Sequence, residues 1–311
     1  MGHIKAGVTQ GSVLSPLLFI VYINDLEKGI TSFVKFFADD TSLFSIVHDP
    51  EVSAEELNHD LALISTWAHQ WKMCFNPDQA KQAEEILFSQ KLKKPDHPPI
   101  YFGVTEVKRV SDHKHLGLIL DSKLSFAKHI SEKISTARKG IGIIKHLAPY
   151  LPLKSRDQIY KMHVRPHLDY CDIIYHSPAK TIEISGSDSS RSLTSQMKTL
   201  ERTQYQAALA VSGAWKGTSQ TKIYDELGWE TLDQRRMFRR LTQFYKIMTG
   251  LTPEYLRTPI PPILPITNRL STMIGTDRYQ NSFFPDSVNL WNLLGPDLQG
   301  AESLSIFKKT F

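Results

Sequence analysis

The sequence predicts an α+β fold in which a mixed region of strands and helices precedes a helical region. Up to Asp121, apolar runs of strand length alternate with turn residues, and two stretches repeat apolar residues at helical spacing. After Asp121, apolar residues recur at helical spacing over several long stretches. The content of 41% hydrophobic and 22% charged residues is that of a folded globular chain.

The strands of the first region are predicted from short apolar runs that turn residues interrupt. Phe33–Phe37 has strand length, the segment Ala38–Thr41 breaks it, and Ser42–Val47 predicts a return strand. These segments together predict a β-hairpin. Further strands are expected at 85–89, at 100–102 and 104–110 on either side of Gly103, and at 115–120.

The helices are predicted from capping residues and from apolar spacing. Ser15-Pro16 is typical of a helix start, with Ser15 as N-cap and a run toward Gly29. Ser53 and Glu56 form a capping-box pattern ahead of a helix that ends at Asn76-Pro77. Later helices are expected at 130–145, 153–164, 197–211 and 232–248, with a serine-rich loop at 185–196, a proline-rich linker at 253–265 and an apolar tail at 283–311.

The positive charge of the chain is concentrated in one segment. The net charge is +5, and residues 122–165 hold ten basic and two acidic side chains. Such a block suits a polyanion such as nucleic acid. A solvated helical face that binds nothing is the alternative.

Composition excludes several classes of protein. Two cysteines, Cys74 and Cys171, exclude a disulfide scaffold and a four-cysteine zinc site. The longest apolar run, Val13–Ile23, is too short to span a bilayer, so no membrane partner is expected. The sequence has no Asn-x-Ser/Thr glycosylation motif, which agrees with an intracellular location and leaves nucleus and cytoplasm both open.

Two adjacent carboxylates, Asp39 and Asp40, are predicted at the tip of the first hairpin. Neighbouring carboxylates repel each other unless a cation neutralises them, and Mg²⁺ prefers hard oxygen ligands. The alternative is a pair of exposed turn aspartates, which turns favour in any case.

A second motif is the glycine-containing segment from Gly7 to Phe19. A glycine beside a helix start lets the backbone approach a base or sugar, and Gln10 and Ser12 can form hydrogen bonds there. The segment lacks the Gly-Lys-Ser/Thr of a phosphate-binding P-loop. A plain loop before a helix is the alternative.

In combination these motifs resemble the reverse transcriptases of non-LTR (LINE-type) retrotransposons. The resemblance lies in Gly-Val-Thr-Gln-Gly-Ser-Val-Leu-Ser-Pro-Leu-Leu-Phe (7–19), in Tyr-Ile-Asn-Asp-Leu (22–26) and in Phe-Phe-Ala-Asp-Asp-Thr (36–41). It continues in segments 71–77, 113–121, 165–170, 228–245 and 281–291. The motifs occur in the family's order and cover nearly the whole chain.

The resemblance implies a division into three parts. Residues 1–121 would be the C-terminal part of a palm domain, made of antiparallel hairpins and helices. Residues 122–250 would be a basic helical thumb and its extension, and residues 251–311 a proline-rich linker and packing tail. The implied reaction is RNA-directed DNA polymerisation, with an RNA template, a DNA primer, deoxynucleotides and two Mg²⁺ ions.

The resemblance also implies roles for individual residues. Asp39 and Asp40 match the catalytic metal-binding pair, Leu116 and Gly117 match the hairpin that grips the primer, and the loop of Gln10, Gly11 and Ser12 would face the templating base and the nucleotide. The family has a lysine that protonates the leaving pyrophosphate, and Gln79 aligns with it. Lys81, two residues further on, is the candidate for that proton donor. The nucleic-acid backbone would contact Lys128, Lys133, Arg138, Lys139 and Lys145.

One departure from the family limits the expected activity. The family's first catalytic aspartate precedes the Gln-Gly-Ser loop, and here nine residues precede Gln10. We therefore expect a truncated polymerase that binds Mg²⁺ weakly and is inactive as an isolated chain, with an N-terminal segment or an endonuclease domain of the parent element as a missing partner. A non-catalytic remnant that binds nucleic acid through residues 122–165 and an inert remnant stay open.

Overall fold

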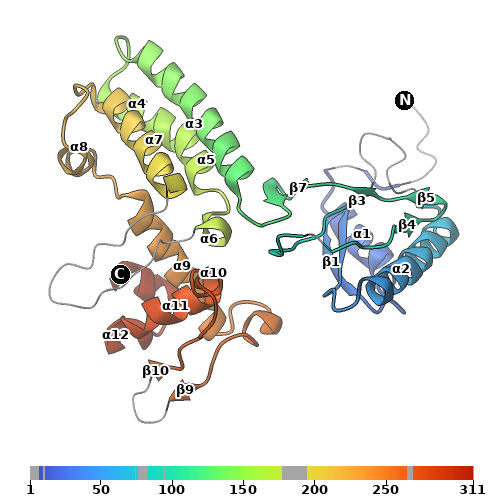
Figure 1. Cartoon of the computed structure of the whole chain (residues 1–311). Coiled ribbons are helices and arrows are strands. Elements are labelled where there is room, and N and C mark those ends of the chain that lie inside the picture. The colour runs from blue at the N-terminus through green and yellow to red at the C-terminus, as the bar shows by residue number, and fades with distance from the viewer. Residues whose placement is uncertain are drawn as a thin grey trace. The chain divides into compact units, whose positions relative to one another are not determined.

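The computed structural model describes residues 7–9, 11–73, 75, 83–93, 95–176, 195–264 and 269–310. The chain divides into two compact units, of which the first ends at Leu124 and the second begins at Ser125. Most strands belong to the first unit, and helices dominate the second (Figure 1). The predicted α+β fold class is confirmed.

The first unit combines helices with small two-stranded sheets. The helices are α1 (Ser15–Ile23) and α2 (Pro50–Gln70). The antiparallel pairs are β1 (Phe33–Phe37) with β2 (Asp40–Phe44), β4 (Tyr101–Phe102) with β5 (Thr105–Glu106), and β7 (Asp112–His115) with β8 (Leu118–Asp121). The strands β3 (Glu84–Glu85) and β6 (Lys108–Arg109) pair in parallel.

The core of the first unit forms between α1, α2 and the β1–β2 hairpin. Ile23 and Ile64 are buried, and Phe36 and Leu43 of the hairpin pack against them. Successive strand residues point to opposite faces, so burial of one face fixes the register of the hairpin.

Asp60 anchors the chain where it enters β1. Its buried carboxylate accepts hydrogen bonds from the backbone N–H of Thr31, at 3.1 Å, and of Ser32, at 2.8 Å. Burial raises the pKa of Asp60. The hydrogen bonds from Ser32 and Thr31 together lower it by more, so the pKa lies below its ordinary value. The carboxylate therefore stays charged and ties α2 to the first hairpin.

Two predicted helix starts are wrong by one and four residues, respectively. Ser15 is the first residue of α1 and not its cap. The second helix begins at Pro50, because Asp49 caps it by accepting hydrogen bonds from the next backbone N–H groups, and this places Ser53 inside the helix. An Asp-Pro pair satisfies the requirements of a helix start before the predicted capping box is reached. The predicted end of this helix at 76–77 lies outside the described residues.

Three predicted strand boundaries also differ. The return strand predicted at 42–47 is Asp40–Phe44, the strand predicted at 85–89 is Glu84–Glu85, and segment 104–110 forms β5 and β6 instead of one strand. Val107 separates β5 from β6, and its backbone N–H bonds to the carbonyl of Ile100.

In its described residues, the second unit consists of helices and one short strand pair. The elements that matter for the site are α3 (Ala127–Leu147), α4 (Leu153–Ile159), the π-helix η2 (Tyr160–Val164), α5 (Arg165–Asp169), α6 (Asp172–Tyr175), α7 (Ser195–Ser212), α8 (Gln220–Leu227) and α9 (Leu232–Met248). They are followed by the turn η3 (Glu254–Leu256), β9 (Ile263–Leu264), β10 (Arg269–Leu270), α10 (Asp277–Gln280), α11 (Phe283–Asn292), α12 (Pro296–Gln299) and α13 (Leu304–Thr310).

The C-terminal tail packs onto α9. Phe244 and Tyr245 of α9 are buried against Trp291 of α11 and Phe307 of α13. Within the proline-rich segment, the structure has the turn η3 and the strand β9, which pairs with β10. The predicted serine-rich loop lies outside the described residues up to position 194, and its last two residues begin α7.

A π-helix brings the segment before Pro166 close to α3. The N–H of Arg165 bonds to the carbonyl of Tyr160, five residues earlier. A Cβ added at Gly140 of α3 would lie 2.8 Å from Val164 Cγ2 and 3.3 Å from the backbone oxygen of His163. Glycine therefore allows this close approach.

We predict opposite effects of alanine at the two glycines of α3. Gly140→Ala should lower the free energy of unfolding by about 1–3 kcal/mol, because the added methyl group meets the packed side chain of Val164 and the backbone of His163. Gly142→Ala is the matched control, since nothing lies within 4 Å of its added Cβ, and it should raise that free energy by about 0.5–1 kcal/mol. Urea unfolding followed by far-UV circular dichroism measures both, and equal effects of the two variants would contradict the packing described here.

Candidate polymerase and nucleic-acid site

The carboxylate pair lies at the tip of a tight hairpin. Phe37 pairs with Asp40, so Ala38 and Asp39 form the two-residue turn, and Ala38 has a φ of 52°. Residues other than glycine rarely adopt positive φ, and the geometry makes the turn sharp. The predicted hairpin with the two aspartates at its tip is confirmed; the roles of these aspartates stay predictions.

Both carboxylates are available to a ligand. Asp39 and Asp40 are exposed, and within the described part of the chain neither side-chain carboxylate makes a hydrogen bond or an ion pair. Among the described residues, no group of three or more His, Cys, Asp or Glu side chains could hold a metal ion. The hairpin therefore supplies two oxygen-donor side chains, and any further ligands have to come from substrate, water or another carboxylate.

The loop ahead of α1 is held by serine hydroxyls. Ser15 Oγ donates to the carbonyl of Thr9 at 2.6 Å, and Ser12 Oγ accepts from the N–H of Ser15 at 3.1 Å. Gly11 has a φ of +85°, which favours glycine at this turn. Ser12 therefore has a structural role in addition to any contact with a nucleotide, while Gln10 lies outside the described residues, as do Gln79 and Lys81.

Leu116 and Gly117 form a second two-residue turn, between β7 and β8. Their φ values are +46° and +83°, and two successive positive φ values are typical of a type I′ hairpin turn. The strand predicted at 115–120 is wrong, because the chain reverses at these two residues. The hairpin implied by the family resemblance is present. The apolar character of 116–120 suggested a single strand, and Gly117 was the only local signal for the turn.

The basic side chains of α3 do not share one surface. Lys128, Arg138, Lys139 and Lys145 are exposed. Lys133 is half-buried, and its Nζ lies 4.9 Å from the centre of the Tyr170 ring. The buried stripe of the helix, which includes Ile134, Ala137 and Ile144, forms its inner face.

Residues 3–120 match the family described as reverse transcriptase (RNA-dependent DNA polymerase). This segment is a reverse transcriptase domain. The chain is 29% identical over 182 residues to the probable RNA-directed DNA polymerase from transposon X-element of Drosophila melanogaster. This alignment covers 55% of the present chain and 19% of the relative. It is 27% identical over 189 residues to the RNA-directed DNA polymerase from mobile element jockey of Drosophila funebris, covering 57% and 20% of the two chains.

The predicted family is thereby confirmed as a retrotransposon reverse transcriptase of the LINE type. The aligned part spans about a fifth of the length of these curated relatives. No solved structure matches the chain significantly. Among the described residues, no helix is both long and apolar enough to cross a membrane.

Beyond the reverse transcriptase domain, the second unit carries basic residues that sequence reasoning missed. Lys198 and Arg202 of α7 and Lys216 of the following loop line a groove of about 940 Å³ together with Lys145 of α3. These residues are spread over more than 70 positions, and Lys198, Arg202 and Lys216 lie outside the basic block at 122–165. No local signal in the sequence brings them together, because helix packing alone does so.

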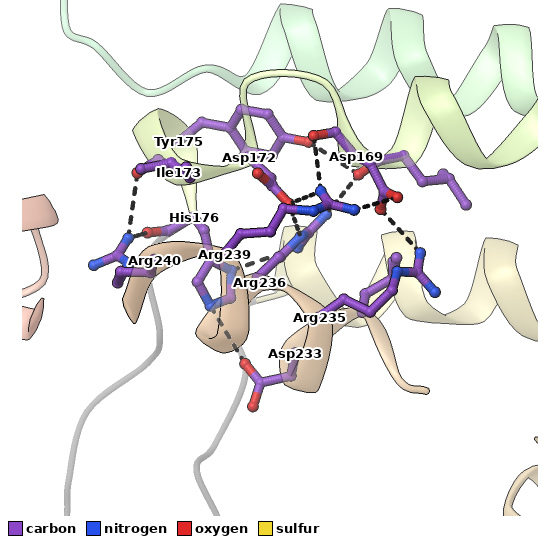
Figure 2. A network of polar contacts seen from close by, with 12 residues as sticks. Asp169, Asp172, Ile173, Tyr175, His176, Asp233, Arg235, Arg236, Arg239 and Arg240 are labelled. Carbon is purple, nitrogen blue, oxygen red and sulfur yellow. Dashed lines mark hydrogen bonds and ion pairs between the residues drawn. The ribbon is translucent and has the colours of Figure 1, made fainter. Parts of the chain in front are cut away.

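A network of contacts between arginines and carboxylates lies inside the same unit. Four of its arginines come from α9 (Figure 2). Arg235 contacts Asp169 at 2.9 Å, and Arg239 bridges Asp169 and Asp172. Arg240 contacts Asp286 of α11 at 2.7 Å. Arg236 donates to the carbonyl of Leu168 at 3.1 Å. Sequence reasoning assigned no role to this Arg-Arg-x-x-Arg-Arg pattern.

The network shifts the pKa values of its members in opposite directions. Burial raises the pKa of Asp169, but Arg235 and Arg239 outweigh it, so that pKa lies below its ordinary value. The pKa of Asp172 is raised, because burial outweighs the effect of Arg239. Burial lowers the pKa of His176 from 6.5 to about 4, so its imidazole is neutral at neutral pH.

The buried histidine predicts a pH-dependent stability. Below pH 6.5 the unfolded chain takes up a proton at His176, whereas the folded chain does so only near pH 4. The free energy of unfolding should therefore fall by about 3 kcal/mol as the pH decreases across this window. His176→Gln should remove this part of the pH dependence in urea titrations.

An exposed histidine of the neighbouring π-helix provides the control. His163→Gln makes the same substitution at an exposed position. The loss of stability at low pH that is assigned to His176 should persist in this variant. A pH dependence that survives in His176→Gln would contradict the proposed contribution of this side chain.

Proposed function

We propose that this chain carries the metal-binding palm hairpin and the thumb of an RNA-directed DNA polymerase of a non-LTR retrotransposon. Its substrates would be an RNA template, a DNA primer and deoxynucleotides. The carrying observation is the exposed Asp39–Asp40 pair on a strained two-residue turn, inside a segment that matches the reverse transcriptase family. In the three-part division proposed here, residues 1–121 belong to the palm, 122–250 to the thumb and 251–311 to the linker and tail.

The hairpin fits part of an Mg²⁺ site. Asp39 and Asp40 offer hard oxygen donors on one turn and have no partner among the described residues. When bound there, Mg²⁺ would neutralise charge on the phosphates and on the attacking hydroxyl of the primer. The role of the two aspartates is to hold this charge beside the primer end. The Leu116–Gly117 turn would hold the primer strand, and the Gly11–Ser12 backbone would approach the nucleotide.

Exposed apolar side chains on α1 and β1 support a further partner for the palm. Leu17, Ile20 and Val21 of α1 are each more than half exposed, as are Phe33 and Phe37 of β1. Exposed apolar side chains in this number favour the packing of another segment. We propose that the segment packed here brings the additional carboxylate that the two-metal chemistry requires.

Primer extension tests the proposal. The 311-residue chain alone should not extend a DNA primer on an RNA template with Mg²⁺, because one hairpin supplies only two carboxylates. Placed behind the preceding polymerase segment of the X-element relative, it should extend the primer. Asp39→Asn should then lower the rate roughly a hundredfold to ten-thousandfold, since several kcal/mol of metal-dependent stabilisation are lost.

The exposed carboxylate Glu55 of α2 provides the control for this assay. Glu55→Gln should leave the extension rate unchanged. If the isolated chain extends the primer in an Asp39-dependent way, the need for another segment is wrong. If the joined protein is active and Asp39→Asn has no effect, the assignment of the hairpin is wrong.

The basic face of α3 predicts salt-sensitive binding to an RNA–DNA hybrid. The logarithm of the affinity should fall linearly with the logarithm of the salt concentration, by about 0.9 for each phosphate contacted in duplex DNA. Replacing Arg138, Lys139 and Lys145 together with alanine should reduce the slope by roughly 2–3. Lys308→Ala with Lys309→Ala is the control, because these exposed lysines lie on α13 and not on α3. A salt-independent affinity would reject nucleic-acid binding by the thumb.

A non-catalytic nucleic-acid-binding protein is the second candidate function. Two observations favour it. The basic surface of α3 is exposed, and the carboxylate pair has no third metal-binding side chain beside it among the described residues. Salt-sensitive binding of the hybrid together with an inactive joined protein would select this function.

A further inference from the structure

A basic groove runs along the seam between α3 and α7. The two helices pack side by side (Figure 1). One hollow of about 740 Å³ is lined by Arg138 and Lys139, and a second of about 940 Å³ by Lys145, Lys198, Arg202 and Lys216. We call these two hollows the α3–α7 groove.

The groove is positive because six basic side chains line it against one acidic residue, Glu201, whose carboxylate is held by neighbouring donors. Glu201 accepts hydrogen bonds from Tyr224 Oη at 2.8 Å, from Gln220 Nε2 at 2.9 Å and from the N–H of Leu232 at 2.8 Å. The six basic side chains that line the groove are exposed, with no ion pair to any described residue. Such a surface attracts a chain of phosphates.

An exposed indole ring lies next to the groove. Trp215 is 88% exposed, and its neighbours Ala214 and Lys216 both line the groove. Hydrogen bonds hold the backbone of this loop. The carbonyl of Trp215 accepts one from the N–H of Thr218 at 3.1 Å and one from the Thr218 hydroxyl at 2.8 Å. A tryptophan side chain gains much free energy when it is buried, so its exposure on a hydrogen-bonded loop is unusual.

We propose that the α3–α7 groove binds single-stranded nucleic acid, with the phosphates on its basic side chains and one base stacked on Trp215. Aromatic rings beside basic grooves bind unpaired bases in this way, largely without regard to sequence. The 21 residues of α3 extend over about 31 Å, which suits a binding site of several nucleotides. The inference rests on the proposed function and extends it, because it assigns the unpaired part of a template to a surface that includes α7.

The test compares one labelled RNA of about 12 nucleotides, single-stranded and paired with DNA, by fluorescence anisotropy. Trp215→Ala should weaken single-strand binding roughly 5- to 100-fold, which corresponds to stacking of one base. It should change hybrid binding less than about twofold, because a paired base has no free face for the indole. The high exposure of Trp215 predicts that the variant folds normally, and circular dichroism checks this.

The phosphate contacts are tested with Lys198, Arg202 and Lys216 replaced together by alanine. The salt slope for the single strand should fall by roughly 0.7 for each lost contact. Controls are Tyr255→Ala, which removes another exposed ring, and Lys308→Ala with Lys309→Ala, which removes exposed charge from α13. Both controls should bind the single strand like the parent chain.

The outcomes separate this inference from the proposed function. If the parent chain binds neither RNA nor hybrid, the proposed nucleic-acid function itself fails. If it binds both but the groove variants behave like the controls, only the groove assignment is overturned. If Trp215→Ala weakens single-strand and hybrid binding equally, stacking of an unpaired base on the indole is rejected.

Discussion

The buried arginines of α9 are the constraint on which the second unit depends. A buried guanidinium is expensive unless a carboxylate and enough acceptors surround it, and breaking such a pair costs about 3–5 kcal/mol. Arg235, Arg239 and Arg240 meet carboxylates from α5, α6 and α11, so a rotation of α9 would leave several charges unpaired at once. The network therefore specifies how these helices pack, more than it adds to net stability.

The surface proposed to bind nucleic acid rests on this interior. Gln204 of α7 donates to the carbonyl of Glu230 just before α9, and Tyr160 stacks on Trp229 with ring centres 3.8 Å apart. The π-helix in turn lies against Gly140 of α3. The inner faces of α3 and α7 are thus connected to the arginine network through direct contacts. The exposed basic side chains of the α3–α7 groove take no part in these contacts. An ordered basic groove loses less entropy on binding than a mobile one.

The first unit is organised on a smaller scale. Its sheets have two strands each, and Asp60 together with the α1–α2 core holds the first hairpin in position. The hairpin presents Asp39 and Asp40 to solvent, where their hard oxygen donors are open to a cation. The exposed apolar residues of α1 and β1 lie in the same unit. Both features agree with a palm that works in contact with metal, substrate and further polypeptide.

The sequence by itself determined the α+β class and the hairpin with its two aspartates, because these depend on local patterns, and it determined the family, because the family's motifs occur in order along the chain. It misplaced the start of α2, where Asp49 capped the helix earlier. The local apolar pattern also predicted one strand across Leu116, where only the family resemblance implied a hairpin, since leucine seldom adopts a positive φ. Only the tertiary structure placed Lys133 on a different surface from Arg138 and gathered Lys145, Arg202 and Lys216 around one groove. It also decided that the arginines of α9 are buried, because the partners that neutralise them lie far away in the chain and meet them only when the helices pack.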